Sequence, residues 1–165
     1  LDAEFFAHME EIDLCFRLKL LGKSIFCLPT STVYHVGGGT LAMMSTFKTF
    51  LNYRNNLWLI TKNHFESPLF FKLFWRLALD GLSGVNFVLR GLPQHTGAIL
   101  KAHVVFYKHL FKVLKKRKSN KERFKNCTTN LTGHYQKNVI ADYFLKGNRK
   151  FSDLNSKDFR EAKTQ

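Results

Sequence analysis

The chain has 165 residues, enough for one ordinary domain with an apolar core, and a formal net charge of +14. A secretory signal would open with a charged segment, an apolar stretch and a small-residue cleavage site. The sequence does not open in this way, so no such signal is predicted. The three cysteines are widely spaced, which excludes a disulfide framework and favours a reducing compartment. Because the sequence opens on Leu1, we interpret it as a fragment of a longer protein.

The charge is divided unevenly along the chain. Residues 1–100 hold nine Lys or Arg and seven Asp or Glu, whereas residues 101–165 hold seventeen and five. A basic C-terminal part favours an anionic partner such as phospholipid head groups, nucleic acid or a phosphorylated substrate. Five of the seven acids in the first part lie within thirteen residues, which makes them the first candidate functional feature: Asp2, Glu4, Glu10, Glu11 and Asp13.

The first third of the chain has the pattern of an α/β domain. Residues 10–21 have apolar residues at helical spacing, and Gly22 suits a left-handed C-terminal cap. Two β-branched and aromatic runs, 24–28 and 31–36, predict short strands, and glycines at 37–39 then interrupt regular structure. This order predicts the end of an α/β domain, with the glycine loop at one edge of a sheet.

The rest of the chain predicts helices. Residues 47–63 have helical periodicity, and Ser67-Pro68 predicts a break. Residues 69–92 are strongly apolar, but charges at intervals and two glycines argue against a membrane span. That pattern is typical of an interfacial helix, and equally of a helix buried in a larger soluble core. Residues 94–118 are amphipathic, and residues 119–165 are polar and basic.

The acidic cluster contains groups that could act in catalysis. Glu10 and Glu11 open the helix predicted at 10–21, where the peptide dipoles keep a carboxylate ionised and able to accept a proton. Asp13 and Arg17 are one turn apart and predict an ion pair that stabilises this helix. Acids at a helix N-terminus are also favoured for stability alone, so this pattern by itself favours a structural role.

A histidine and glycines form the second candidate site. His35 ends the second predicted strand and is followed by Gly37 and Gly38. An imidazole there could bind a metal or a phosphate oxygen, and the glycines would let backbone N–H groups approach a phosphate. A structural histidine before a flexible turn has the same pattern. No nucleotide-binding G-x-G-x-x-G or P-loop sequence is present.

Taken together, the two sites resemble a known family. Residues 1–40 contain, in order, the pattern acid-acid-x-acid-Leu-x-x-Arg, a glycine, a predicted strand, a proline, a second predicted strand, a histidine and glycines. This order resembles the C-terminal half of GT-A-type glycosyltransferase family 2 domains. The match is similar to bacterial rhamnosyltransferase-like enzymes of cell-surface polysaccharide assembly, and extends to about residue 63. This chain departs from the usual Glu-Asp pair by having Glu at both positions.

The resemblance implies roles for individual residues. Glu11 would be the catalytic base, beside Glu10. Asp13 and Arg17 match the supporting Asp-Leu-x-x-Arg continuation. His35, with Gly37 and Gly38, matches a position near the donor diphosphate and its divalent metal, Mg²⁺ or Mn²⁺.

The implied reaction is an inverting transfer from a nucleotide-diphosphate sugar to a hydroxyl of a saccharide or lipid-linked acceptor. The resemblance and the basic charge place it at the cytoplasmic face of a membrane, with an anionic membrane surface as partner. The family's metal-binding Asp-x-Asp motif does not occur in these residues, so we expect the chain alone to be inactive.

We therefore predict an α/β remnant of the catalytic domain at 1–45, a mainly α, membrane-leaning extension at 46–118, and a basic tail at 119–165. One alternative is a non-catalytic, membrane-associated helical module, which leaves the acidic N-terminal segment without a purpose. The other is a nucleic-acid-binding module. It is disfavoured because the aromatics concentrate in apolar runs at 70–111 and are not interleaved with Lys and Arg.

Overall fold

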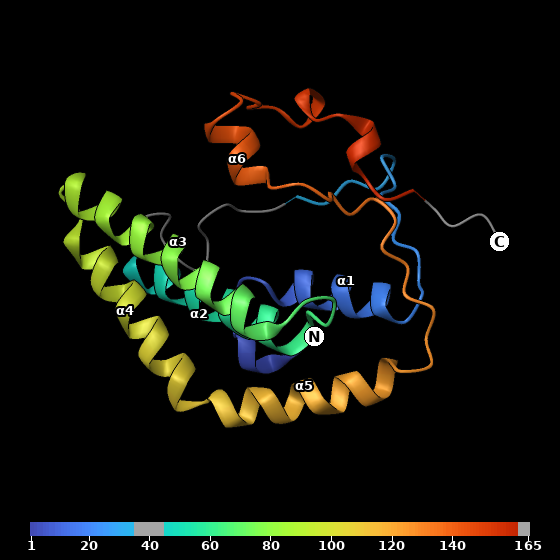
Figure 1. The fold of residues 1–165 in the computed structure, drawn as a ribbon, viewed down its shortest axis with the longest axis horizontal. Helices are drawn as coiled ribbons and strands as arrows, with labels where there is room; N and C mark the ends of the chain where they lie inside the picture. The colour runs from blue at the N-terminus through green and yellow to red at the C-terminus, as the bar shows by residue number, and fades with distance from the viewer. Residues whose placement is uncertain (35–44, 162–165) are drawn as a thin grey trace. The chain divides into compact units, whose positions relative to one another are not determined.

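A computed structural model describes residues 1–34 and 45–161, and this part of the chain is all α. Three short 3-10 segments accompany the helices: η1 (Ala3–Phe5), η2 (Phe151–Asp153) and η3 (Ser156–Asp158). The α-helices are α1 (Glu10–Leu20), α2 (Thr46–Asn63), α3 (Leu69–Leu89), α4 (Pro93–Lys108), α5 (Leu110–Phe124) and α6 (Val139–Phe144) (Figure 1).

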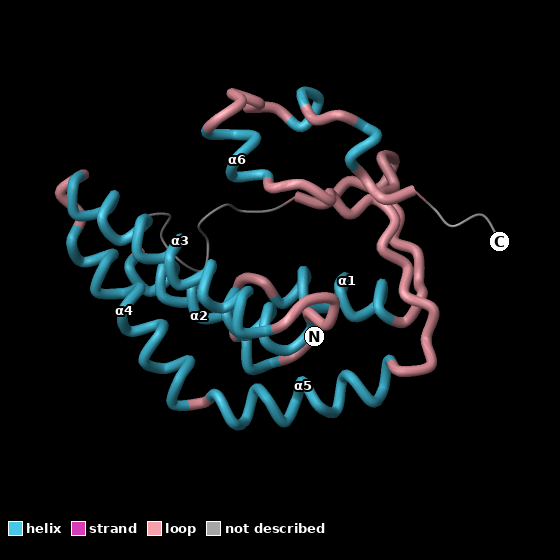
Figure 2. The backbone as a smooth tube through the Cα atoms, in the orientation of Figure 1, coloured by secondary structure: helices cyan, strands magenta, loops and turns pink. Residues whose placement is uncertain are grey.

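The predicted α/β remnant is wrong. Within the described residues there is no sheet, and the strand-like contact is one isolated bridge between Tyr135 and Phe159 (Figure 2). Residues 24–34 have no regular structure and are exposed, with Phe26 82% and Tyr34 95% accessible. Their β-branched and aromatic composition favours a half-buried sheet surface, but a strand also needs a neighbour to pair its backbone groups, and the described residues supply none.

The described chain divides into two compact units. Unit 1 comprises residues 1–17 and 26–126, and unit 2 comprises residues 18–25 and 127–165.

The helix boundaries of unit 1 follow from its sequence. Ser45 caps α2, its Oγ accepting a hydrogen bond from the Phe47 N–H at 3.2 Å. Pro68 is the residue before α3, as expected for a residue that cannot continue a preceding helix. The helices predicted at 10–21 and 47–63, and the break at Ser67-Pro68, are therefore confirmed.

Helix α2 is the centre of unit 1, where it packs against α3, α4 and α5 (Figure 1). One apolar cluster joins Phe5, Leu57, Trp58, Leu59, Phe106 and Val113, and a second joins Phe50, Leu51, Ala98 and Ala102. Both clusters combine α2 with residues of α4. The first also includes Phe5 of the N-terminal segment, so the core itself holds the segment that leads into α1.

Helix α3 is the most apolar helix of the chain but is poorly covered within unit 1. Its fully buried residues are Asp80 and Gly84, while Phe70, Phe71, Phe74 and Trp75 are each more than half exposed. It is thus not a buried helix of this unit. Among the described residues, no helix is long and apolar enough to cross a membrane.

In unit 2, Gly22 ends α1 as predicted. Its φ is +79°, and the Lys23 N–H donates to the Leu18 carbonyl at 2.9 Å. A Cβ atom at this position would lie 2.6 Å from the Thr128 carbonyl oxygen, which is closer than real Cβ contacts occur. Both the backbone conformation and the space therefore require glycine.

We expect Gly22→Ala to destabilise the protein by more than the roughly 1 kcal/mol that a left-handed backbone alone costs a non-glycine residue. Gly147→Ala is the matched control, because Gly147 also has a positive φ of +75° but open space around its Cβ position. Chemical denaturation of both variants measures the difference. An equal decrease in the free energy of unfolding of the two variants would show that the contact with Thr128 does not contribute to stability.

Candidate functional site

The two glutamates singled out by the sequence form the first turn of α1. Glu11 is exposed. Glu10 is half-buried, and its Oε2 is buried without a hydrogen-bond partner among the described residues. Two cavities of unit 1, one between α3 and α4 and one beside Asp2, are not lined by either glutamate. Glu11 is thus accessible to an incoming group.

The backbone immediately before these glutamates is strained. Phe6, His8 and Met9 have φ values of 65°, 67° and 71°, in the left-handed region that non-glycine residues rarely adopt. Each such residue costs on the order of 1–3 kcal/mol and persists only where surrounding contacts impose it. Residues 6–9, called the entry loop below, therefore require strong external restraints.

Asn55 of α2 supplies the main restraint. Its side chain is fully buried, and Nδ2 donates to the carbonyl oxygens of Phe5, Ala7 and His8 at 3.0, 2.8 and 2.8 Å. Because three carbonyl groups within residues 5–8 accept hydrogen bonds from one amide nitrogen, the chain must curl tightly around it. The left-handed residues make this curl possible.

Arg54 fixes the other side of the Asn55 amide. Its Nε and Nη2 donate to the Asn55 Oδ1 at 2.9 and 2.7 Å, and Nη2 also reaches the Phe5 carbonyl at 3.0 Å. The guanidinium group lies over the Trp58 ring, 4.5 Å from its centroid. The orientation of Asn55 is therefore set, with its NH₂ group directed at the entry loop.

Asp13, which follows the glutamates in α1, fixes the position of this helix. It is fully buried and forms ion pairs with Arg17 at 2.9 Å and Lys62 at 2.7 Å, and it accepts a hydrogen bond from Asn63 at 2.7 Å. The predicted pair between Asp13 and Arg17 is confirmed. A buried carboxylate that has three partners stabilises a unique position of the helix, and removal of any partner would leave charge uncompensated.

Asp2 and Glu4 extend this ion-pair network to α5. Lys62 and Lys116 contact Asp2 at 2.8 and 2.9 Å, and Lys112 contacts Glu4 at 2.9 Å. Burial alone would raise the pKa of both carboxyls, but hydrogen bonds from the lysines outweigh it and lower the pKa of each. Burial likewise would lower the pKa of Lys116, yet its bonds to these carboxylates raise it.

The second candidate site cannot be placed. His35, Gly37 and Gly38 lie outside the described residues, so the expected proximity of His35 to Glu11 is not tested. Within the described part of the chain, no group of three or more His, Cys, Asp or Glu residues could hold a metal ion. The divalent metal implied by the resemblance, with His35 near it, therefore stays a prediction.

The residues of α2 that hold the entry loop and Asp13 were not predicted from the sequence: Arg54, Asn55, Lys62 and Asn63. A signal was present in the spacing. Leu51, Asn55 and Lys62 fall on one helical face, so two polar residues occupy a face that is otherwise apolar. Asparagine in a helix interior is also unfavourable unless its side chain has a defined partner.

We expect Asn55→Ala to destabilise unit 1 by about 2–3 kcal/mol, because the carbonyl groups of Ala7 and His8 would lose their side-chain donor and that of Phe5 would lose one of its donors. The adjacent Asn56→Ala is the matched control. Its Oδ1 is buried without a partner, so its removal should be neutral or slightly stabilising. Urea denaturation compares the two variants, and similar effects would contradict the role of Asn55 in restraining the entry loop.

The lowered pKa values of Asp2 and Glu4 predict acid sensitivity. Groups whose pKa is depressed by folding stabilise the protein above their unfolded pKa of about 4, and this stability is lost as the pH falls through the folded values. We expect the free energy of unfolding to decrease steadily below about pH 4. Asp2→Asn should flatten this decrease, whereas Glu122→Gln at an exposed position of α5 should leave it unchanged. An unaltered acid slope in Asp2→Asn would disprove the assignment.

Comparisons of the chain with known protein families, curated proteins and solved structures find no match. The resemblance to glycosyltransferase family 2 therefore depends on the sequence pattern of residues 1–63 alone.

Proposed function

We propose that this chain supplies the acceptor-side part of an inverting, nucleotide-sugar-dependent glycosyltransferase, with Glu11 as the catalytic base. The observation that carries the proposal is the entry loop. Three left-handed non-glycine residues directly precede the two glutamates, and buried side chains of α2 hold them in place. Such strain is concentrated at functional sites, where it serves to position reactive groups.

In this proposal Glu11 and Asp13 have separate roles, which their different burial supports. Asp13 is fully buried and has Arg17, Lys62 and Asn63 as partners, so it can only support the helix. Glu11 lies two residues earlier on the same helix and is exposed. Of the two carboxylates, Glu11 is thus the one that an acceptor hydroxyl can reach, as a general base requires.

In the proposed reaction, a Glu11 carboxylate oxygen accepts the proton of an acceptor hydroxyl. The hydroxyl oxygen forms a bond to the anomeric carbon as the bond from that carbon to the diphosphate breaks. The electron pair of the broken bond leaves with the nucleoside diphosphate, and the configuration at the anomeric carbon inverts. Proton removal by a positioned carboxylate contributes roughly 10²–10⁴-fold to such rates.

Asn55, Arg54 and Asp13 act as positioning residues in this proposal, since they contact the backbone or the helix that carries Glu11 and not the reacting atoms. The donor and its metal would bind outside the described residues. The acceptor would be a saccharide or a lipid-linked saccharide.

A second candidate is a membrane-associated helical module without catalytic activity. It is favoured by the exposed aromatic residues of α3 together with the basic α5, a combination that suits the interface of an anionic membrane. Both candidates place the chain at a membrane surface. They differ in whether Glu11 has a chemical role.

Glu11→Gln in the full-length protein separates the two candidates. The amide keeps the size and polarity of the side chain but cannot accept the proton, so we expect sugar transfer to fall by roughly 10²-fold or more. The measurement is the formation of labelled glycoside from a panel of nucleotide-diphosphate sugars, with membranes supplying the acceptor.

Glu122→Gln is the control, because it removes the same charge from an exposed position of α5 and should retain full transfer. Because Glu11 is exposed, Glu11→Gln should also keep the melting temperature of the unmodified protein. Transfer at the normal rate by Glu11→Gln would remove the catalytic assignment and favour the membrane-associated module.

A further inference from the structure

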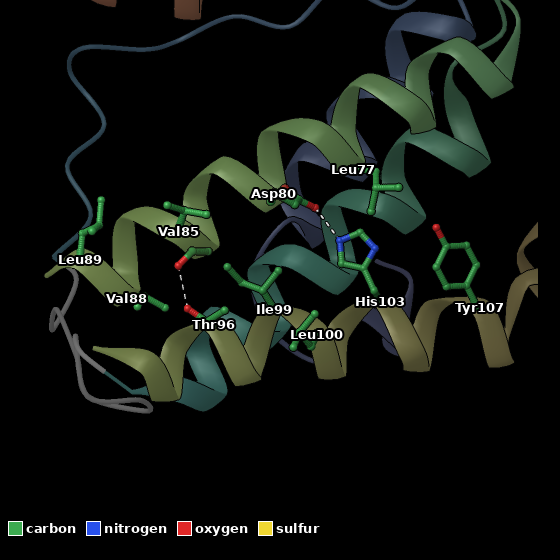
Figure 3. A pocket seen from close by; sticks show the side chains of 12 residues that line it. Leu77, Asp80, Val85, Val88, Leu89, Thr96, Ile99, Leu100, His103 and Tyr107 are labelled. Atoms are coloured by element: carbon green, nitrogen blue, oxygen red, sulfur yellow. Dashed lines mark hydrogen bonds and ion pairs between the residues drawn. The ribbon is translucent and has the colours of Figure 1, made fainter. Parts of the chain in front are cut away.

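An apolar groove of about 440 Å³ runs between α3 and α4 (Figure 3). Figure 3 shows its walls, with Leu77, Val85 and Val88 from α3 and Ile99, Leu100 and Tyr107 from α4. At ~30 Å³ for a water-sized group, the space holds roughly fifteen methylene-sized groups. Its shape and lining suit a hydrocarbon chain more than a polar molecule.

Two glycines of α3 line this groove. A Cβ atom at Gly81 would meet nothing within 4 Å, so the missing side chain leaves open space. At Gly84 a Cβ atom would lie 3.2 Å from Thr96 Cγ2, and the Thr96 hydroxyl donates to the Gly84 carbonyl at 2.8 Å. Gly84 therefore allows the two helices to approach, while Gly81 leaves the groove open beside that contact.

Polar groups meet in the groove near Tyr107. Asp80 pairs with Arg76 at 2.8 Å and with His103 Nε2 at 2.9 Å. The His103 side chain is nine-tenths buried, and its Nδ1 is buried with no hydrogen-bond partner in the described chain. A buried polar atom without a partner costs free energy, so an oxygen of a bound molecule would satisfy it.

The charge of the two helices indicates the kind of head group. Residues 69–108 contain five basic residues and a single acid, Asp80, whose carboxylate is already paired. An anionic group is attracted to this surface, and a cationic group is repelled by it.

We propose that the groove between α3 and α4 binds the hydrocarbon chain of a single-chain anionic amphiphile, with a head-group oxygen bonded to His103 Nδ1. Because His103 Nε2 is directed at Asp80, Nδ1 is the ring nitrogen that remains to contact a head-group oxygen. This proposal is independent of the catalytic role of Glu11, because Glu11 does not line the groove.

The probe is laurate, added below its micelle concentration to the whole chain, with binding measured by calorimetry. Gly81→Leu places a side chain in the wall of the groove, where its Cβ atom would meet no atom within 4 Å, and it replaces a helical glycine, so it should not lower stability. We expect it to weaken laurate binding at least tenfold. Gly97→Leu is the matched control: it also replaces a helical glycine with open space around it, but it does not line the groove, and it should bind normally.

The head-group contact has its own test. His103→Gln keeps a donor for Asp80 and removes Nδ1, so laurate should bind roughly tenfold more weakly. Dodecyltrimethylammonium has the same chain length with a cationic head, and it should bind much more weakly than laurate. Unchanged binding in His103→Gln, or equal binding of the two amphiphiles, would overturn the assignment of an anionic head group.

Two further results would overturn the proposal as a whole. One is normal laurate binding by Gly81→Leu, since the groove would then not be the binding site. The other is a dimer, seen by analytical ultracentrifugation, that Gly81→Leu dissociates. In that case a second copy of the chain covers the groove.

Discussion

The arrangement of the N-terminal segment depends on one buried amide. Asn55 Nδ2 collects the carbonyl groups of Phe5, Ala7 and His8, and these contacts impose left-handed backbone angles on residues that do not favour them. Because Phe5 is also part of the apolar core, the segment is held by both packing and hydrogen bonding. Without Asn55, the entry into α1 would relax and the glutamates would lose their fixed position.

Charge is used in two different ways in this basic chain. Around Asp13 and Asp2, lysines are drawn into buried or half-buried pairs, where each cation is matched by a carboxylate. Along α3 and α4, by contrast, the bases outnumber the acids five to one. The first arrangement stabilises the fold around α1. The second leaves an uncompensated positive field, which the fold does not need and which an anionic partner would use.

The sequence predicted local features better than their assembly. The helices at 10–21 and 47–63, the Gly22 cap and the pair of Asp13 with Arg17 follow from spacing over a few residues, and the structure confirms them. The strands at 24–28 and 31–36 failed over the described residues, because pairing with a neighbouring strand is a non-local condition that a β-like composition does not guarantee. The entry loop was missed for the same reason, since its restraint comes from Asn55, about fifty residues away.

The composition of α3 is not explained by the fold of unit 1. Most of its apolar side chains remain exposed, although burial of each would contribute about 1.5–3 kcal/mol. The helix is attached by polar contacts, Tyr53 with Ser83 and Gly84 with Thr96, and by the packing of Leu73 and Phe87, and none of these contacts uses Phe70, Phe71, Phe74 or Trp75. An exposed apolar surface of this kind marks a contact with another apolar phase or molecule. In the groove beside it, a bound hydrocarbon chain would cover part of this surface, at Leu77, Val85 and Val88, and would give the buried imidazole nitrogen of His103 a partner.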